Sequence, residues 1–78
     1  FVDMVSLAKN VSMIELDVKN DWIGKNLIEL NLRKKYSINV VAQRKGDAVS
    51  VDIDPHATLL EKDKLIVIVN TEKLAKLK

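Results

Sequence analysis

Residues 27–46, LIELNLRKKYSINVVAQRKG, join three elements of different kinds in one short stretch. The spacing of the apolar residues in its first part predicts a short amphipathic helix. Arg33, Lys34 and Lys35 then form a basic turn, and the segment Ile38–Lys45 predicts a strand. Arg33 therefore lies where the helix meets the strand. This layout fits a small module that pairs with a copy of itself and captures an anion better than it fits an enzyme.

The segments before this stretch predict a strand and the start of the helix. Residues 1–10 repeat apolar side chains at helical spacing, which indicates the end of a preceding helix or linker. Alternation over Met13–Val18 predicts a half-buried strand. Asn20 or Asp21 would cap the helix, and Trp22 is expected to be a core or cap residue. The core-facing side of this helix would consist of Ile23, Leu27 and Leu30.

The segments after it predict two more strands and a last helix. A hairpin turn around Gly46 leads into a third strand over Val49–Ile53, and Pro55 marks a loop. The apolar run Leu65–Val69 predicts the most buried strand, and Asn70 or Thr71 would cap a last short helix carrying Leu74 and Leu77. The expected fold is α+β: a small four-stranded sheet with two short helices, in the order strand, helix, three strands, helix.

The composition excludes several classes of protein. A chain of 78 residues allows one domain, and the absence of cysteine excludes disulfides and thiolate metal sites. A single histidine and two distant glycines leave no catalytic pair, metal cluster or phosphate loop. Asp52 and Asp54 share one face of the predicted third strand, where carboxylates are ordinarily solvated. We therefore expect no enzyme, no metal and no cofactor in this domain.

Charge and hydropathy indicate the kind of partner. Thirteen basic and eleven acidic residues are interspersed along the chain, whereas a nucleic-acid binder gathers a larger basic excess on one face. No apolar run approaches the ~18 residues that cross a membrane, so we expect no direct membrane insertion. Apolar residues make up 47% of this small chain, which favours a self-associating surface. Because the chain begins with Phe1, we expect a domain of a longer protein.

Five residues are candidates for binding. Arg33 is either a solvated cation at a helix end or a clamp for a phosphate group. Pro55 and His56 are either simply exposed or stack against a base. Asn39 is a residue type normally depleted from strands, so its side chain is expected to make a specific hydrogen bond, for example to the edge of a base. Ile28 lies off the core-facing side of the helix and is a candidate for contact with a partner.

An ordered set of residues extends this interpretation over nearly the whole chain. The set comprises Gly24, Leu27, Leu30, Leu32, Arg33, Tyr36, Ile38–Ala42, Arg44, Gly46, Leu60, Asp63 and Leu65. It resembles the TrkA-C domain, the C-terminal lobe of subunits that regulate the conductance of K⁺ (RCK), from about Ser12 to Leu77. Asn39 and the Pro55-His56 pair look most like the Ktr-type gating subunits of bacterial potassium uptake. The resemblance assigns residues 11–78 to this domain.

The resemblance implies a function and a set of ligand contacts. Such lobes follow a nucleotide-binding lobe in a cytosolic ring beneath a membrane potassium pore, and they pair as two-fold dimers. In the Ktr-type branch the dimer cleft binds cyclic di-AMP, which lowers potassium uptake. Arg33 would meet a phosphate, Pro55 and His56 an adenine face, and Asn39 the adenine edge. The remaining contacts would come from Leu27, Ile28, Asn31, Leu32, Ile38 and Val40.

The resemblance also implies a cellular location for the domain, and two alternative functions remain. The domain would be cytoplasmic, held at the inner face of the plasma membrane through its transporter partner, with no nucleic acid bound. A first alternative is the same fold as a dimerisation module, or as a sensor of another small anion, in a different cation transporter. A second is a small nucleic-acid-binding domain.

Overall fold

A five-stranded antiparallel sheet organises the described part of the chain, residues 4–73 of this computed structural model. The strands are β1 (Met4–Ala8), β2 (Val11–Asp17), β3 (Ile38–Lys45), β4 (Ala48–Ser50) and β5 (Lys64–Asn70). Between β2 and β3 the chain forms a 3-10 turn, η1 (Asn20–Trp22), and two short helices, α1 (Leu27–Leu30) and α2 (Leu32–Tyr36). The α+β class is confirmed.

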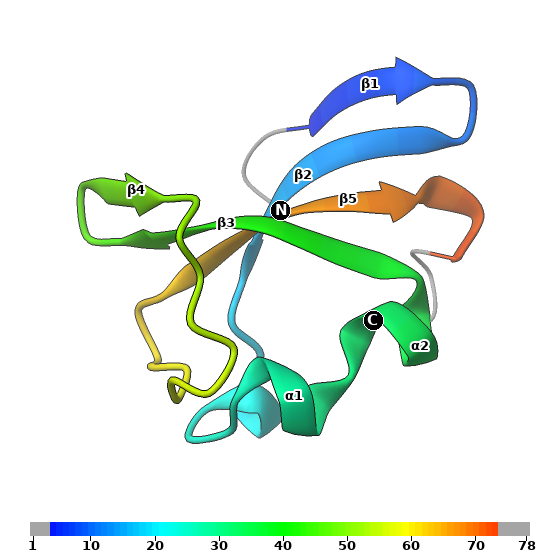
Figure 1. Cartoon of the computed structure of the whole chain (residues 1–78). Coiled ribbons are helices and arrows are strands. Elements are labelled where there is room, and N and C mark those ends of the chain that lie inside the picture. Colours follow the sequence, from blue (N-terminus) through cyan, green and yellow to red (C-terminus); the bar gives the residue numbers. More distant parts are fainter. Residues whose placement is uncertain (1–3, 74–78) are drawn as a thin grey trace.

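The last strand in the sequence lies in the centre of the sheet. The strand order is β1-β2-β5-β3-β4, so β5 pairs with β2 on one side and with β3 on the other. β4 pairs only with the Gln43–Lys45 end of β3. Within the described residues, the Ile38–Ala42 part of β3 therefore has a strand on one edge and none on the other. This open edge lies beside α2 (Figure 1).

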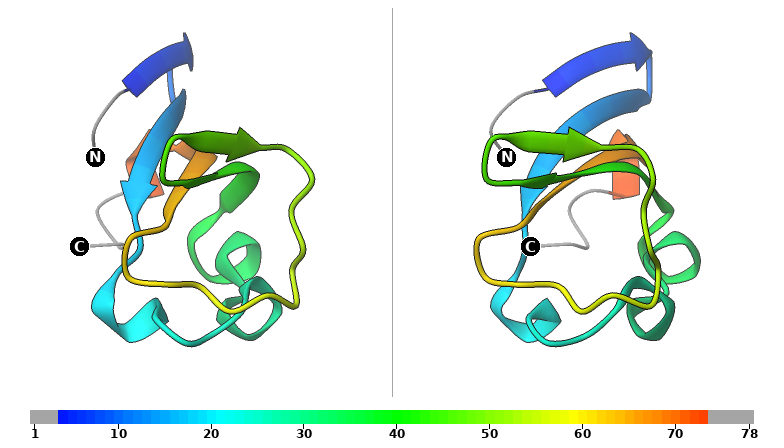
Figure 2. Two further views of the ribbon diagram at one scale, coloured as in Figure 1. Left: turned by 90° about the vertical axis from the view of Figure 1, so that its left-hand side faces the viewer. Right: turned by 60° about the vertical axis from the view of Figure 1, so that its left-hand side comes forward.

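The hydrophobic core lies on one face of the sheet. The helical segments and the long β4–β5 loop gather on that side (Figure 2). Leu65, Val67 and Val69 of β5 point into the core, whereas Ile66 and Ile68 alternate with them and are half-buried. Burial of each large aliphatic side chain stabilises the fold by about 1.5–3 kcal/mol. The other buried apolar residues are Ile14, Leu16, Val18, Trp22, Leu30, Leu32, Ile38, Ala42 and Leu59.

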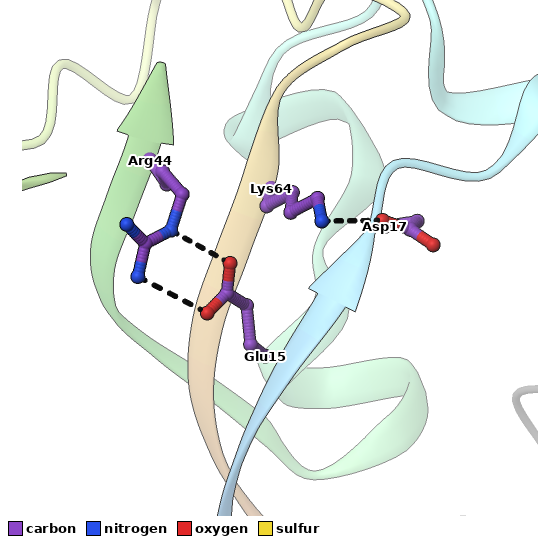
Figure 3. Close-up of polar contacts among 4 residues, drawn as sticks. All are labelled: Glu15, Asp17, Arg44 and Lys64. Atoms are coloured by element: carbon purple, nitrogen blue, oxygen red, sulfur yellow. Dashed lines mark hydrogen bonds and ion pairs between the residues drawn. The ribbon is translucent and has the colours of Figure 1, made fainter. Parts of the chain in front are cut away.

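Charged side chains connect the strands on the opposite face. Glu15 of β2 and Arg44 of β3 reach across β5 and form a two-point contact, with Nε–Oε2 at 2.8 Å and Nη2–Oε1 at 3.3 Å (Figure 3). Lys64 of β5 lies 3.7 Å from Asp17 of β2. The contact with Arg44 pairs the buried Glu15 carboxylate with a cation.

A second polar cluster centres on buried Asp63, at the end of the β4–β5 loop. Its Oδ2 accepts hydrogen bonds from the Leu60 N–H at 3.0 Å and from Gln43 Nε2 and Lys45 Nζ, both at 3.2 Å. These contacts tie the loop to the end of β3. A buried carboxylate is tolerated here because it is both paired with a cation and hydrogen-bonded.

The N-terminal segment corrects the sequence-based expectation. Residues 4–8 form β1, an edge strand paired with β2, rather than the end of a helix, so the sheet has five strands instead of four. The apolar spacing of this segment suits both structures, since Val5 and Leu7 also alternate. The open edge of β2 supplies the hydrogen-bond partners that select the strand. Residues 1–3 lie outside the described residues.

The predicted two-turn helix is broken into shorter pieces. Gly24 has a φ of +83°, so the chain turns there and the helix begins only after Asn26. Asn26 Oδ1 accepts from the Glu29 N–H at 2.8 Å, and Glu29 Oε1 accepts from the Asn26 N–H at 3.4 Å, which completes a capping box. Ile23 is 37% exposed and is not a core residue, whereas Trp22 is buried, as expected.

The structure confirms the predicted β3 and its turn but shortens the third predicted strand. β3 has the predicted bounds, and Gly46, with a φ of +61°, makes the hairpin turn after it. The third predicted strand is wrong beyond Ser50, since Val51 is 76% exposed and the chain is irregular from there to the loop at Pro55. Residues 71–73 form a 3-10 turn. The predicted last helix, with Leu74 and Leu77, lies outside the described residues.

Candidate functional site

An open groove of about 290 Å³ lies where the two short helices meet the open edge of β3. It brings together seven of the ten residues expected to contact a ligand. The lining residues are Leu27, Asn31, Leu32, Arg33, Ile38, Asn39 and Val40. The groove thus combines apolar walls with three polar side chains, a composition common in small-molecule sites.

The groove exists because the chain changes direction at both ends of α2. Asn31 and Ser37 adopt the left-handed conformation, with φ of 48° and 57°, and they bracket the five-residue helix. Leu32 is buried in the core, and the next residue along the helix, Arg33, is consequently turned toward solvent. The second reversal, at Ser37, leads directly into β3. Ile38 is buried while Asn39 beside it is exposed.

The three polar side chains of the groove are available to a ligand. Asn31, Arg33 and Asn39 are exposed, and none of these side chains makes a hydrogen bond or an ion pair with the rest of residues 4–73. Among the described residues, the groove lining contains no acidic side chain, and Arg33 is its one charged residue. A guanidinium offers a planar pair of donors that suits phosphate, and each carboxamide offers both donors and an acceptor.

The open edge of β3 adds main-chain groups to this site. An unpaired strand edge presents N–H and C=O groups at alternate positions, and the Ile38–Ala42 segment is such an edge in the described structure. The register shifts between Val40 and Ala42, and a bulge of this kind re-aims side chains and ends regular pairing. A ligand in the groove can therefore contact the main-chain groups of β3 and the groove side chains at the same time.

Three of the expected ligand residues do not line the groove. Ile28 lies on α1 and is 54% exposed, whereas Pro55 and His56 lie in the β4–β5 loop. The His56 N–H donates to Asp54 Oδ1 at 2.9 Å, which shapes a tight turn at the tip of this loop. Pro55 and His56 are exposed.

The loop is anchored next to α1. The Leu59 N–H donates to Lys25 O at 2.8 Å, and the Gly24 N–H donates to Leu59 O at 2.9 Å. These two bonds hold the loop against the turn that precedes α1, and both views of Figure 2 show the loop descending from β4 to that level. Leu59 is itself fully buried, so the anchor is part of the core.

A second groove, of about 280 Å³, was not anticipated from the sequence. It lies between the β3–β4 hairpin and the following loop. Its lining residues are Gln43, Lys45, Ala48, Ser50, Asp52, Asp54 and Ala57. Asp52 and Asp54 are exposed, as expected. Among the described residues no three His, Asp or Glu side chains gather closely enough to hold a metal ion, and no helix in residues 4–73 is both long and apolar enough to cross a membrane.

Comparison with known families and proteins gives consistent matches. A family model described as the TrkA-C domain matches residues 11–78. The chain is 33% identical over 67 residues to the Ktr system potassium uptake protein C of Bacillus subtilis (strain 168), covering 86% of this chain and 30% of that protein. The chain therefore spans less than a third of the length of this relative.

Solved structures share the fold. One is the RCK C domain of the potassium transport protein KtrA in complex with cyclic di-AMP, which matches with a TM-score of 0.77 and 28% identity over 83% of this chain and 76% of the other. Another is the RCK_C domain dimer of S. agalactiae BusR with cyclic di-AMP, with a TM-score of 0.71 and 20% identity over 85% and 90% of the two chains. The second likeness concerns the fold alone.

Proposed function

Because the chain belongs to the TrkA-C domain family, we propose that it is a regulatory domain of a bacterial potassium-transport system that binds cyclic di-AMP at a homodimer interface. Binding lowers potassium uptake through the longer gating subunit that contains the domain. The observation that supports this proposal most is the groove at the open edge of β3. It joins an apolar wall with one guanidinium and two carboxamides that have no side-chain partner within residues 4–73.

The chemistry of the groove suits the chemistry of this ligand. Cyclic di-AMP carries phosphodiester anions, and Arg33 offers paired donors to a phosphate. Asn39, together with the main-chain groups of the β3 edge, offers the donors and acceptors that the adenine edge requires. Leu27, Ile38 and Val40 supply apolar contact for the flat base and the sugar.

The size of the groove favours a shared site. Its volume of about 290 Å³ is just below the ~300–1,000 Å³ typical of pockets for drug-sized ligands, so it suits half of a cyclic dinucleotide. Cyclic di-AMP has two-fold symmetry, and a symmetric dimer presents the same half-site to each half of it. Exposed Ile28 beside the groove then contacts the partner copy, and Pro55 and His56 reach the ligand only in the dimer.

The match to the KtrA domain also supports cyclic di-AMP as the ligand. That domain is 28% identical and is described in complex with cyclic di-AMP. Regulation also requires that the ligand bind one arrangement of the longer protein more tightly than another. Equal affinity for both would leave the equilibrium between them unchanged.

Titration calorimetry on this chain tests the proposal. We expect cyclic di-AMP to bind with one ligand per two chains, and Arg33→Ala or Asn39→Ala to weaken binding by at least tenfold each. Lys34→Ala is the matched control, because Lys34 is an exposed cation on the same helix that does not line the groove. Its effect should be within about twofold at moderate salt.

Three results would contradict the proposal. A chain that is dimeric in solution but releases no heat with cyclic di-AMP would instead be a bare dimerisation module. Equal weakening by Lys34→Ala and Arg33→Ala would mean that general positive charge, not the groove, attracts the ligand. Binding to DNA or RNA with a steep salt dependence would point to a nucleic-acid partner.

A further inference from the structure

We propose that Asn31 is a specificity-determining residue of this site, and that its carboxamide contacts the sugar–phosphate part of the ligand beside Arg33. The inference rests on the proposed function and names a contact within the same groove. The resemblance implied only that Asn31 is part of the wall. The structure provides reasons to give it a polar role.

The first reason is that the Asn31 side chain has no structural task in the described chain. Asn31 occupies the junction of α1 and α2, and its N–H donates to Leu27 O at 3.0 Å. It also holds the N-cap position of α2, where an asparagine side chain ordinarily accepts a hydrogen bond, yet it makes no cap bond. Asn26, at the start of α1, shows the ordinary use, with its Oδ1 bonded at 2.8 Å.

The second reason is the backbone conformation. With φ of 48° and ψ of 49°, position 31 lies in the left-handed region, where glycine is the least strained residue. Ser37 is the other left-handed residue that is not glycine in residues 4–73, and its Oγ accepts from Lys73 Nζ at 3.3 Å. The Ser37 side chain therefore has a partner, whereas the Asn31 carboxamide has none among residues 4–73 and lines the groove.

The third reason is the neighbourhood of Arg33. Asn31 lies two residues before Arg33, and both line the groove with buried Leu32 between them in sequence. A ligand phosphate held by Arg33 has its ribose and remaining oxygens next to it. The Asn31 amide can donate to a phosphate oxygen, and its carbonyl can accept from a ribose 2′-hydroxyl. Asn39, on β3, remains for the base.

Asn31→Gly is the decisive variant, because glycine keeps the left-handed backbone and removes the side chain that carries the carboxamide. A hydrogen bond to a charged group contributes about 1.5–3 kcal/mol, so we expect affinity for cyclic di-AMP to fall roughly tenfold or more. Ser37→Gly is the matched control at the other end of α2, outside the groove, and should bind within about twofold of the parent. Thermal melts of both variants should confirm that the fold is retained.

A second variant and a second ligand sharpen the test. Asn31→Asp keeps the shape but places a carboxylate beside the phosphate, so it should bind more weakly than Asn31→Gly, and the difference should shrink as salt rises. With the 2′-deoxy analogue of cyclic di-AMP, a smaller effect of Asn31→Gly assigns the contact to the hydroxyl. An unchanged effect assigns it to the phosphate.

The outcomes separate this inference from the proposed function. If Asn31→Gly or Asn31→Asp binds as well as the parent while Arg33→Ala is weakened, the role of Asn31 is wrong and the proposed function stands. If the parent chain does not bind cyclic di-AMP, both are overturned. An equal loss in Ser37→Gly would make the effect one of backbone geometry and would also overturn the role of Asn31.

Discussion

Replacing Arg44 by methionine should destabilise the domain through the carboxylate that it leaves behind. The Glu15 side chain is 10% exposed and that of Arg44 is 36% exposed. Breaking a fully buried pair from one side costs about 3–5 kcal/mol, whereas an exposed pair contributes about 0.2–1 kcal/mol. Because Arg44 is partly solvated, we expect Arg44→Met to lower the free energy of unfolding by about 2 kcal/mol. For a domain of this size that loss lowers the melting temperature by roughly 8–16 °C.

The double variant Glu15→Leu/Arg44→Met provides the internal control. Removing both charges leaves an apolar contact over β5, so stability should return to within about 1 kcal/mol of the parent. Urea unfolding followed by circular dichroism measures all three chains, at low salt and at 1 M NaCl, where the cost of Arg44→Met should decrease. A double variant that is as unstable as Arg44→Met alone would refute the reasoning, because the loss would then come from the missing arginine stem and not from a stranded charge.

Two further predictions concern α1. Asn26→Ala removes the N-cap of this helix and should cost about 1 kcal/mol of stability, measured by thermal melting. Glu29→Gln retains the capping box and should cost less. Equal losses in the two variants would contradict the importance of the Asn26 side chain. Ile28→Glu should weaken the proposed dimer in sedimentation experiments without lowering the stability of the monomer, since Ile28 is 54% exposed; an unchanged dimer would exclude α1 from the interface.

Local patterns predicted the elements that depend on nearby residues. The β3 hairpin was correct because the predicted strand ends just before Gly46, whose positive φ makes the turn. Arg33 and Asn39 were expected in one site and line one groove, because only one reversal, at Ser37, separates them. Whether they bind a ligand stays a prediction.

Other features depend on contacts between distant segments. The predicted caps Asn20 and Asp21 are wrong, because they lie in the 3-10 turn before Gly24, and the helix begins only after Asn26, which caps it. β1 becomes a strand only because the edge of β2 is free to pair. The position of Pro55 and His56 follows from the anchor at Leu59, which no short pattern indicates.

The central place of β5 has a consequence for synthesis of the chain. The sheet contains two hairpins, β1–β2 and β3–β4, which do not pair with each other. Both pair with β5, the strand that ends at Asn70. Isolated two-stranded hairpins are marginal in water, so we expect neither hairpin to be stable until residues 64–70 have been added between them. A chain truncated before Lys64 should therefore be a substrate for proteolysis.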